Sequence, residues 1–238
     1  MIAGVVVLDA AGTLVDVAGS VGETYAAIAL EEGARLEPGG IERGFGRAMA
    51  AAPPLAFGEL QPAARAAAVR GWWRAVAWAA LAEAGDLPDG FDFESFFDRA
   101  WERFSRSEAW RIHDDVRPAL RALRVRGFPL AVLSNWDRRL VALLAALGLR
   151  GWFCRVVVSS DLRAAKPSRA VFDEVARELA AVEPAAPPVM VGDRLDHDVV
   201  PAIDAGWGAV WLDRAGRGGA PEGVETIRDL RELDALLG

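Results

Sequence analysis

Hydrophobic positions along the chain form two kinds of pattern. Short runs rich in aliphatic residues occur at residues 5–8, 129–133, 153–158, 189–191 and 208–212. A run of this kind, without alternation between apolar and polar positions, is typical of a strand that is buried on both faces of a parallel sheet. The pattern therefore predicts that each run is a buried strand of one sheet.

Apolar residues at helical spacing fill the intervals between these runs. They predict helices at residues 116–126, 138–147, 168–181, 198–205 and 226–237. Strands that alternate with helices favour a doubly wound parallel sheet with right-handed crossovers. The expected fold class is therefore α/β, with a Rossmann-like doubly wound parallel sheet.

The stretch between residues 16 and 107 shows no strand pattern. Its periodicity predicts helices at residues 23–32, from residue 38 to a stop before residue 53, and at residues 62–84 and 93–105. Aromatic stripes on these helices are expected to form the core of an insert or its seam with the main domain. We therefore expect an α/β core made of residues 1–15 and 108–238, interrupted by an all-helical insert at residues 16–107.

Composition limits the classes of partner. Hydrophobic residues make up 53% of the 238 residues, so a sizeable core can form, and the formal net charge is −7. Nucleic acid and anionic membranes require a basic surface, which argues against both as the main partner. A small anion needs only a local cluster of donors and stays compatible with this charge.

The chain also lacks the pattern of a targeting segment. No apolar run reaches the roughly 18 residues of a membrane-spanning helix, and the sequence enters a strand without a basic region or cleavage site. We therefore expect a cytoplasmic protein. The single cysteine, Cys154, lies beside an apolar run and is expected to be a small buried side chain rather than a reactive thiol.

Polar side chains follow the predicted strands at the points where these strands end. Asp9, Ser134 and Asp193 come directly after or close to the ends of three runs, and Lys166 lies in the loop after a fourth. The carboxyl ends of parallel strands share one edge of a sheet, so these groups are expected around a single crevice. Lys166 is the only lysine of the chain, which invites a specific role, although its survival by chance stays open.

The expected chemistry of this crevice follows from its charges. A buried carboxylate is costly unless something pairs with it, so Asp9 is a metal ligand, a nucleophile or both; the alternative is that it only caps the turn after its strand. Two neighbouring carboxylates both stay ionised when a cation bridges them, and hard oxygen ligands favour Mg²⁺. A lysine and a hydroxyl would then hold an anion such as phosphate. The grouping predicts phosphoryl chemistry at a metal, with Asp9 as the attacking carboxylate.

These strand-end residues resemble, in order, the four motifs of the haloacid dehalogenase-like (HAD) superfamily. The matching segments are Asp9-Ala10-Ala11-Gly12-Thr13-Leu14, Leu133-Ser134-Asn135, Lys166-Pro167 and Gly192-Asp193-Arg194-Leu195-Asp196-His197-Asp198. The helical insert resembles the C1-type cap of subfamily IA. Segments such as Gly22-Glu23-Thr24-Tyr25, Trp72-Trp73 and Ser134-Asn135-Trp136-Asp137 are similar to the rhythmically-expressed-gene-like branch, and the resemblance covers nearly the whole chain.

The resemblance implies a metal site. Asp9 would be the nucleophile that forms an aspartyl-phosphate and would also ligate Mg²⁺. Ala11 would contribute its backbone carbonyl, and Asp193 would be the main ligand of the fourth motif. Asp198 would be an outer-shell or water-mediated ligand, which is compatible with an N-cap role in its own helix. Residues 196 and 197, an aspartate and a histidine, are expected to face solvent.

The resemblance also implies a phosphate site. Ser134 would hydrogen-bond the phosphoryl oxygens, with the backbone of Asn135 close by, and Lys166 would offset the charge of the nucleophile and the phosphate. Tyr25, Trp72 and Trp73 of the insert are candidates for selecting the substrate, which the sequence does not identify. The oligomeric state is not predicted either.

One position departs from the pattern of the phosphatases in this family. These enzymes usually carry a second aspartate two residues after the nucleophile, and here that position is Ala11. The missing group would protonate the leaving oxygen and then deprotonate the attacking water, work that is typically worth about 10²–10⁴-fold in rate. We therefore expect weak activity on alkyl phosphates and a smaller loss on aryl or acyl phosphates, whose leaving groups need less proton assistance.

Other relatives also lack this aspartate, but their chemistry fits less well. Phosphonoacetaldehyde hydrolases need a lysine in the cap, and the insert of this chain contains none. The dehalogenases need no metal, so the pair Asp193 and Asp198 would have no purpose. Two hypotheses remain: a Mg²⁺-dependent hydrolase of a small phosphorylated metabolite, and a phosphate-binding or protein-interaction module that has lost efficient chemistry.

Overall fold

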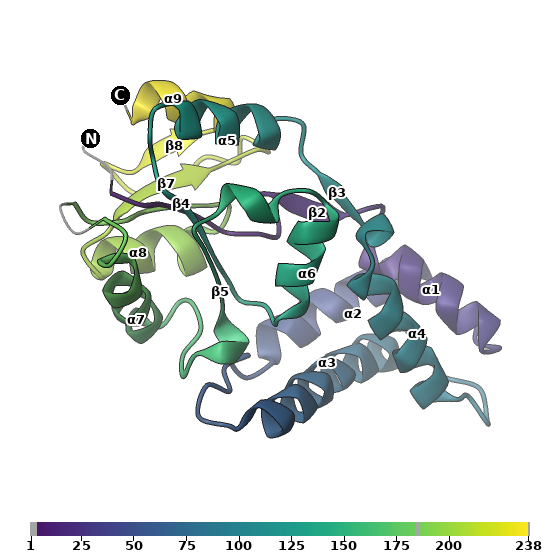
Figure 1. Ribbon diagram of the computed structural model, residues 1–238. Helices are drawn as coiled ribbons and strands as arrows, with labels where there is room; N and C mark the ends of the chain where they lie inside the picture. Colours follow the sequence, from purple (N-terminus) through teal and green to yellow (C-terminus); the bar gives the residue numbers. More distant parts are fainter. Residues whose placement is uncertain (1–3, 184–185, 238) are drawn as a thin grey trace. The chain divides into compact units, whose positions relative to one another are not determined.

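A six-stranded parallel sheet organises the larger part of the chain. The computed structural model describes residues 4–183 and 186–237. The strands lie in the order β5-β4-β1-β6-β7-β8, and every neighbouring pair is parallel (Figure 1). They are β1 (Val6–Leu8), β4 (Leu130–Ser134), β5 (Arg155–Val158), β6 (Val189–Gly192), β7 (Gly208–Leu212) and β8 (Glu225–Ile227). The expected α/β class and parallel sheet are confirmed.

Strand β1 is central because it carries apolar residues on both faces. It pairs with β4 on one side and β6 on the other, so that Val7 lies level with Ala131 and Met190. All residues of these three strands are buried. Because the strands run in the same direction, the residues that follow β1, β4 and β6 meet at one edge of the sheet.

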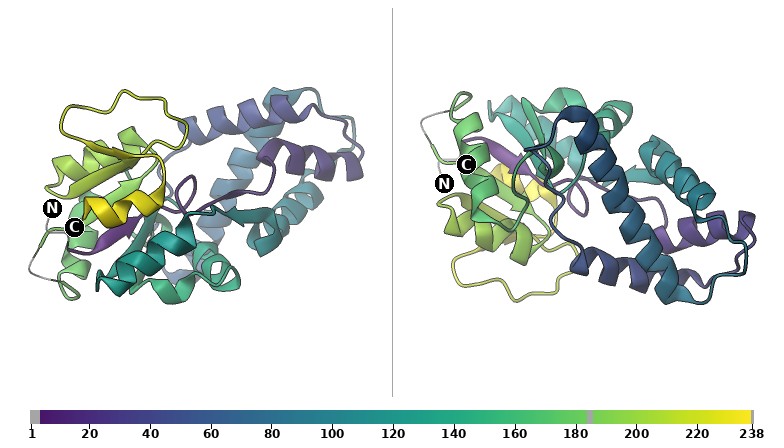
Figure 2. Two further views of the ribbon diagram at one scale, coloured as in Figure 1. Left: turned by 90° about the horizontal axis from the view of Figure 1, so that it is seen from above. Right: turned by 90° about the horizontal axis from the view of Figure 1, so that it is seen from below.

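Helices flank this sheet, as the alternating pattern predicts. They are α5 (Val116–Val125), α6 (Arg139–Ala146), α7 (Arg169–Leu179), α8 (Val200–Asp204) and α9 (Leu233–Leu236). Phe172 of α7 and Ala202 of α8 belong to one buried cluster with Val7 and Met190 of the sheet. On another side of the sheet, the yellow α9 lies beside α5 (Figures 1 and 2).

The structure corrects three expectations for this part of the chain. Residues 226–237 were expected to form one helix, but Thr226 and Ile227 belong to the short edge strand β8, and only α9 is α-helical there. A helix was expected to begin at residue 198, but residues 198 and 199 belong to a π-helical segment, Leu195–Val199, and α8 begins only at Val200. Cys154 is exposed rather than buried, because it precedes the edge strand β5 instead of lying within it.

The chain divides into two compact units. The first contains residues up to 16, residues 55–59 and residues from 112 onward; the second contains residues 17–54 and 60–111. The insert expected at residues 16–107 overlaps most of the second unit. The short segment 55–59 groups with the sheet because Ser159 Oγ donates to the carbonyl of Leu55 at 2.6 Å and the Gly58 N–H donates to that of Leu162 at 2.8 Å.

The second unit is helical. Its helices are α1 (Val21–Glu31), α2 (Pro38–Ala51), α3 (Pro62–Ala84) and α4 (Phe93–Ser105), and the expected bounds of α3 and α4 are confirmed. Tyr25 is buried and lies edge-on to Phe45, Phe96 and Phe104, so it is a core side chain here. The short strands β2 (Val15–Val17) and β3 (Trp110–Ile112) form a separate two-stranded sheet, which the sequence pattern did not reveal because a charged residue interrupts each strand.

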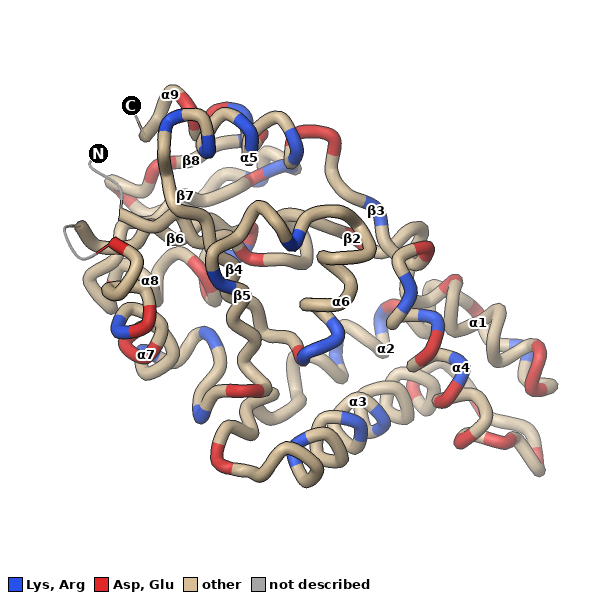
Figure 3. The backbone as a smooth tube through the Cα atoms, in the orientation of Figure 1, with Lys and Arg blue, Asp and Glu red and all other residues tan. Residues whose placement is uncertain are grey.

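Charges of both signs lie close together on this helical unit. Figure 3 shows basic and acidic positions side by side along α3 and α4, where Arg70 pairs with Asp98 and Arg74 with Glu94. All four side chains are substantially exposed, so these ion pairs add little to stability. Among the described helices, none has both the length and the apolar character needed to span a membrane.

Two glycines of α2 offer a matched test of packing. A Cβ on Gly44 would lie 2.6 Å from the carbonyl oxygen of Ala80 in α3, whereas a Cβ on Gly46 would meet no atom within 4 Å. Alanine is favoured over glycine in a helix by about 0.5–1 kcal/mol. We expect Gly46→Ala to raise the free energy of unfolding by this amount and Gly44→Ala to lower it. Urea denaturation of both variants measures the difference, and equal shifts would contradict the described α2–α3 contact.

Candidate active site

Lys166 lies at the centre of the cluster of polar groups at the sheet edge. Its Nζ donates to Oδ1 of Asp9 at 2.7 Å, to Oδ1 of Asp198 at 2.5 Å and to the carbonyl oxygen of Leu133 at 3.0 Å. Asp9 directly follows β1, Leu133 lies in β4, and Asp198 lies in the π-helical segment Leu195–Val199 that follows β6. The Lys166 side chain is almost completely buried. The structure therefore brings together Asp9, Lys166 and Asp198.

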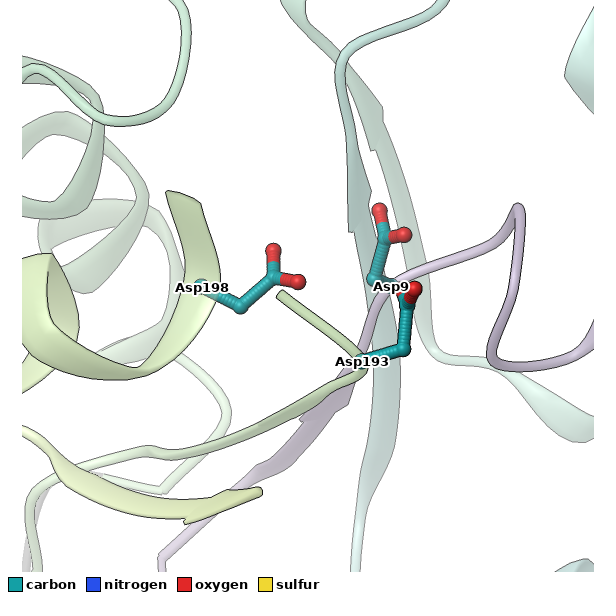
Figure 4. Close-up of side chains that lie close together, drawn as sticks. All are labelled: Asp9, Asp193 and Asp198. Carbon is teal, nitrogen blue, oxygen red and sulfur yellow. The ribbon is translucent and has the colours of Figure 1, made fainter. Parts of the chain in front are cut away.

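Asp193 brings a third carboxylate close to those of Asp9 and Asp198. One oxygen of each carboxylate in the set Asp9, Asp193 and Asp198 lies within 4.8 Å of the others. Figure 4 shows the three side chains turned toward a common space. Oδ1 of Asp193 is buried and has no hydrogen-bond partner among the described residues.

Two glycines allow the backbone to approach these carboxylates. A Cβ on Gly12 would lie 2.6 Å from Oδ2 of Asp193, and the positive φ of 81° at Gly12 also disfavours any other residue. A Cβ on Gly192 would lie 2.3 Å from Oδ2 of Asp198. The glycines of the first and fourth motifs are thus required by close packing around the acids.

Asp198 uses both of its oxygens in bonds to the protein. Oδ1 accepts from Lys166, and Oδ2 accepts from the backbone N–H of Arg194 at 3.1 Å. The N-cap residue of α8 is Val199, so the N-cap role that the sequence left open for Asp198 is not found. Asp196 faces solvent as predicted and pairs with Arg194, while the His197 side chain is 33% exposed.

Asn135 fixes the backbone of Lys166 rather than pointing freely into the site. Its Nδ2 donates to the carbonyl of Lys166 at 2.7 Å, and its Oδ1 accepts from the N–H of Lys166 at 2.9 Å. This reciprocal pair joins the loop after β4 to the loop that carries the lysine. Ser134, the last residue of β4, is buried at the same sheet edge.

Ala11 lies in the tight turn that follows Asp9. The turn closes through hydrogen bonds from the N–H groups of Leu14 and Val15 to the carbonyl of Ala10, at 2.8 and 3.0 Å. Ala11 forms a bridge with Val15, and its side chain is exposed. No acidic group therefore occupies the position two residues after the candidate nucleophile.

A search of protein families matches residues 4–206 to the haloacid dehalogenase-like hydrolases. This chain belongs to that family. It is 34% identical over 181 residues to "Haloacid dehalogenase-like hydrolase domain-containing protein 3" of Mus musculus, which covers 74% of this chain and 69% of the relative. It is also 34% identical over 159 residues to "Phosphoserine phosphatase" of Thermus thermophilus, which covers 65% of this chain and 60% of the relative.

A solved structure supports the fold of this HAD-like hydrolase. The putative HAD-hydrolase YfnB from Bacillus subtilis, bound to magnesium, aligns with a TM-score of 0.67 at 22% identity. The alignment covers 100% of this chain and 99% of that one. At this identity the likeness shows the fold alone.

Burial and neighbouring charges shift the pKa values of Lys166, Asp193 and Asp198. Burial disfavours the charged form of Lys166, but the carboxylates of Asp198 and Asp9 outweigh this effect and raise the pKa of Lys166 above its ordinary value. Burial raises the pKa of Asp198, and Lys166 opposes the increase. Burial, followed by repulsion from Asp9 and Asp198, raises the pKa of Asp193 to about 7.

These residues fit a divalent cation. The acids supply hard oxygen donors, which Mg²⁺ prefers, and the buried Oδ1 of Asp193 has no other described partner. A single lysine compensates only part of the charge of the three acids, and the pKa of Asp193 is raised first by burial and then by repulsion from Asp9 and Asp198. A bound cation would remove that repulsion and keep Asp193 ionised.

The raised pKa of Asp193 predicts a pH-dependent stability of the metal-free protein. The folded state keeps a proton that the unfolded chain releases between about pH 4 and about pH 7, so stability falls as pH rises through this window. We expect the free energy of unfolding to lose about 1–3 kcal/mol between about pH 5 and about pH 8. Urea denaturation with a chelator measures the slope.

Asp193→Asn is the control for this slope. The variant removes the titrating group, so its stability should depend less on pH than that of the wild type. Mg²⁺ should stabilise the wild type more at about pH 8 than at about pH 6, because the proton competes with the cation. Parallel pH profiles for the two proteins would contradict this account.

Proposed function

We propose that this chain is a Mg²⁺-dependent hydrolase of a small phosphorylated metabolite that works through an aspartyl-phosphate on Asp9. The main support is the direct contact of the single lysine with Asp9 in a cluster of three carboxylates, of which those of Asp9 and Asp198 are buried. Names of relatives that include a phosphoserine phosphatase agree with phosphoryl chemistry. The identity of the substrate does not follow from these observations.

The proposed reaction has two steps. A carboxylate oxygen of Asp9 attacks phosphorus, the bond from phosphorus to the leaving oxygen breaks, and that oxygen takes a proton from water, which leaves a hydroxide that the proton released in the second step neutralises. Water then attacks phosphorus, and the bond to Asp9 breaks to release inorganic phosphate and a proton. Lys166, which donates to Oδ1 of Asp9, holds the carboxylate in place and offsets negative charge near it.

The metal would be held by Asp9, Asp193 and the backbone carbonyl of Ala11. When bound, Mg²⁺ supplies charge neutralisation at the phosphoryl group. The engagement of both Asp198 oxygens by Lys166 and the Arg194 N–H favours an outer-shell role for Asp198. Asp193, whose Oδ1 has no described partner, is better placed to bind the cation directly.

The phosphoryl group would be bound by Ser134, Lys166 and the backbone of Asn135. The Asn135 side chain already makes two hydrogen bonds to Lys166, so we assign its contribution to the backbone N–H. Ser134 ends β4 next to Leu133, whose carbonyl accepts from Lys166. Strand β4 therefore carries the Ser134 hydroxyl and also accepts a hydrogen bond from the Lys166 ammonium.

We assign the helical unit to the C1-type cap of subfamily IA, and the chain to the rhythmically-expressed-gene-like branch. The four-helix composition of the insert and the similarity to the mouse protein support this assignment. Trp72, one candidate for substrate selection, donates its indole N–H to the carbonyl of Pro53 at 2.7 Å. Tyr25 is a weaker candidate because it is buried among other aromatic rings.

Ala11 favours a second candidate function. Its methyl group cannot transfer protons, so a protein with this site could bind phosphate, or a partner protein, without efficient turnover. The retention of Asp9 in contact with Lys166 favours the hydrolase instead. A measurement of turnover therefore distinguishes the binding module from the hydrolase.

Hydrolysis of para-nitrophenyl phosphate tests the proposed hydrolase. Its leaving group needs little proton assistance, so the wild type should turn it over with Mg²⁺ despite Ala11. Asp9→Asn removes the nucleophile at nearly constant size and should lower kcat by at least about 10³-fold. Equal rates for the wild type and Asp9→Asn would exclude the proposed hydrolase and leave the phosphate- or protein-binding module as the remaining candidate.

Ala11→Asp tests the explanation for weak activity. The side chain of Ala11 is exposed, so an aspartate can be accommodated. We expect kcat on an alkyl phosphate to rise by up to about 10²–10⁴-fold, because proton transfer is restored. Ala11→Asn, which has the same shape and cannot act as an acid, should not show the increase. An equal effect of both variants would contradict the missing proton donor.

A further inference from the structure

Arg214 contacts the turn after Asp9 from a distant part of the sequence. It follows β7 by two residues, and its Nη2 donates to the carbonyl of Thr13 at 2.8 Å while its Nε donates to that of Gly12 at 3.4 Å. Arg214 belongs to none of the four motifs, although it comes close to the end of a predicted strand. Proximity to the end of a predicted strand was also the feature that identified Asp9, Ser134 and Asp193.

Asp115 holds the guanidinium of Arg214 in this orientation. Its Oδ2 accepts from Nη1 at 2.7 Å and its Oδ1 from Nη2 at 3.1 Å, while Oδ2 also accepts from the N–H of Leu230 at 2.7 Å. The Asp115 side chain is 4% exposed and that of Arg214 is 25% exposed. A bidentate pair of this kind fixes both the position and the plane of the guanidinium.

We propose that Arg214 and Asp115 form a clamp that positions the turn between Asp9 and Thr13 for cation binding. The role rests on the proposed function, because that turn carries the Ala11 carbonyl and abuts Asp193. Arg214 and Asp115 are positioning residues: they bond to the backbone of the turn and to each other, and they supply no group to the reaction.

The position of the turn between Asp9 and Thr13 affects the cation site because Gly12 lies so close to Asp193. There is no space for even one additional carbon between Gly12 and the Asp193 carboxylate. A small displacement of the turn therefore changes the distance between the Ala11 carbonyl and the acids. By holding the carbonyls on the two residues after Ala11, Arg214 limits such displacement.

Arginine suits this role better than lysine. The planar guanidinium bonds to Asp115 and to the carbonyls of Gly12 and Thr13 at the same time. A lysine ammonium has one nitrogen on a flexible chain and cannot reproduce this fork. Arg214→Lys therefore keeps the charge and loses the clamp.

Magnesium titration of the folded protein tests the clamp. Isothermal calorimetry should show that Arg214→Lys binds Mg²⁺ at least about tenfold more weakly than the wild type, or about 1.4 kcal/mol. Arg231→Lys is the matched control, since Arg231 makes the same kind of fork to Asp229. It should remain within about twofold of the wild type. A purely structural role for Arg214 would lower thermal stability without changing the affinity of the folded protein.

Hydrogen exchange adds a readout that requires neither metal nor activity. The amides of Gly12, Leu14 and Val15 donate within the turn, so their exchange in metal-free protein reports its local opening. We expect exchange at least about fivefold faster in Arg214→Lys than in Arg231→Lys. If Arg214→Lys does not fold, Asp115→Asn, which keeps the shape and loses the charge, is measured in its place.

The outcomes are distinct. Weaker Mg²⁺ binding together with faster exchange supports the clamp, even if the wild type proves to have no hydrolase activity, which would overturn only the proposed function. Unchanged Mg²⁺ affinity or unchanged exchange in the folded clamp variant overturns the clamp, even if hydrolysis is observed.

Discussion

The site depends on one buried cation held between acids. The Lys166 ammonium donates to Asp9 and Asp198 at hydrogen-bond distance, and it is the only lysine of the chain. It stays charged because these carboxylates outweigh the cost of burial. Its single charge compensates three acids incompletely, and burial together with repulsion from Asp9 and Asp198 raises the pKa of Asp193. A second cation beside Asp193 is the simplest way to neutralise the negative charge that Lys166 leaves uncompensated.

The parallel sheet makes this concentration of charge possible. Strands β1, β4 and β6 are buried throughout and end at one edge, so the residues after them converge without long loops. Gly12 and Gly192 then let the backbone pass directly beside the carboxylates of Asp193 and Asp198. The apolar strands supply the rigidity, and the glycines supply the space that charged side chains occupy.

Sequence patterns predicted the parts that depend on burial and strand direction. The runs around Val7 and Met190 identified central strands, and their ends identified Asp9 and Asp193. The pattern did not reveal β8, β2 or β3, because each of these short strands contains polar residues and so has no aliphatic run. It also missed that both oxygens of Asp198 are bound by the protein, and that Arg214 reaches the turn after Asp9, since these contacts join segments far apart in the chain.

The central claim is that a divalent cation allows Asp9 and Asp193 to be ionised together. Proton release on Mg²⁺ binding tests it most directly, by calorimetry at about pH 6 in two buffers of different ionisation enthalpy. The account predicts that the wild type releases about one proton per bound ion and that Asp193→Asn releases almost none. Saturable Mg²⁺ binding without proton release, or no Mg²⁺ binding at all, would contradict it.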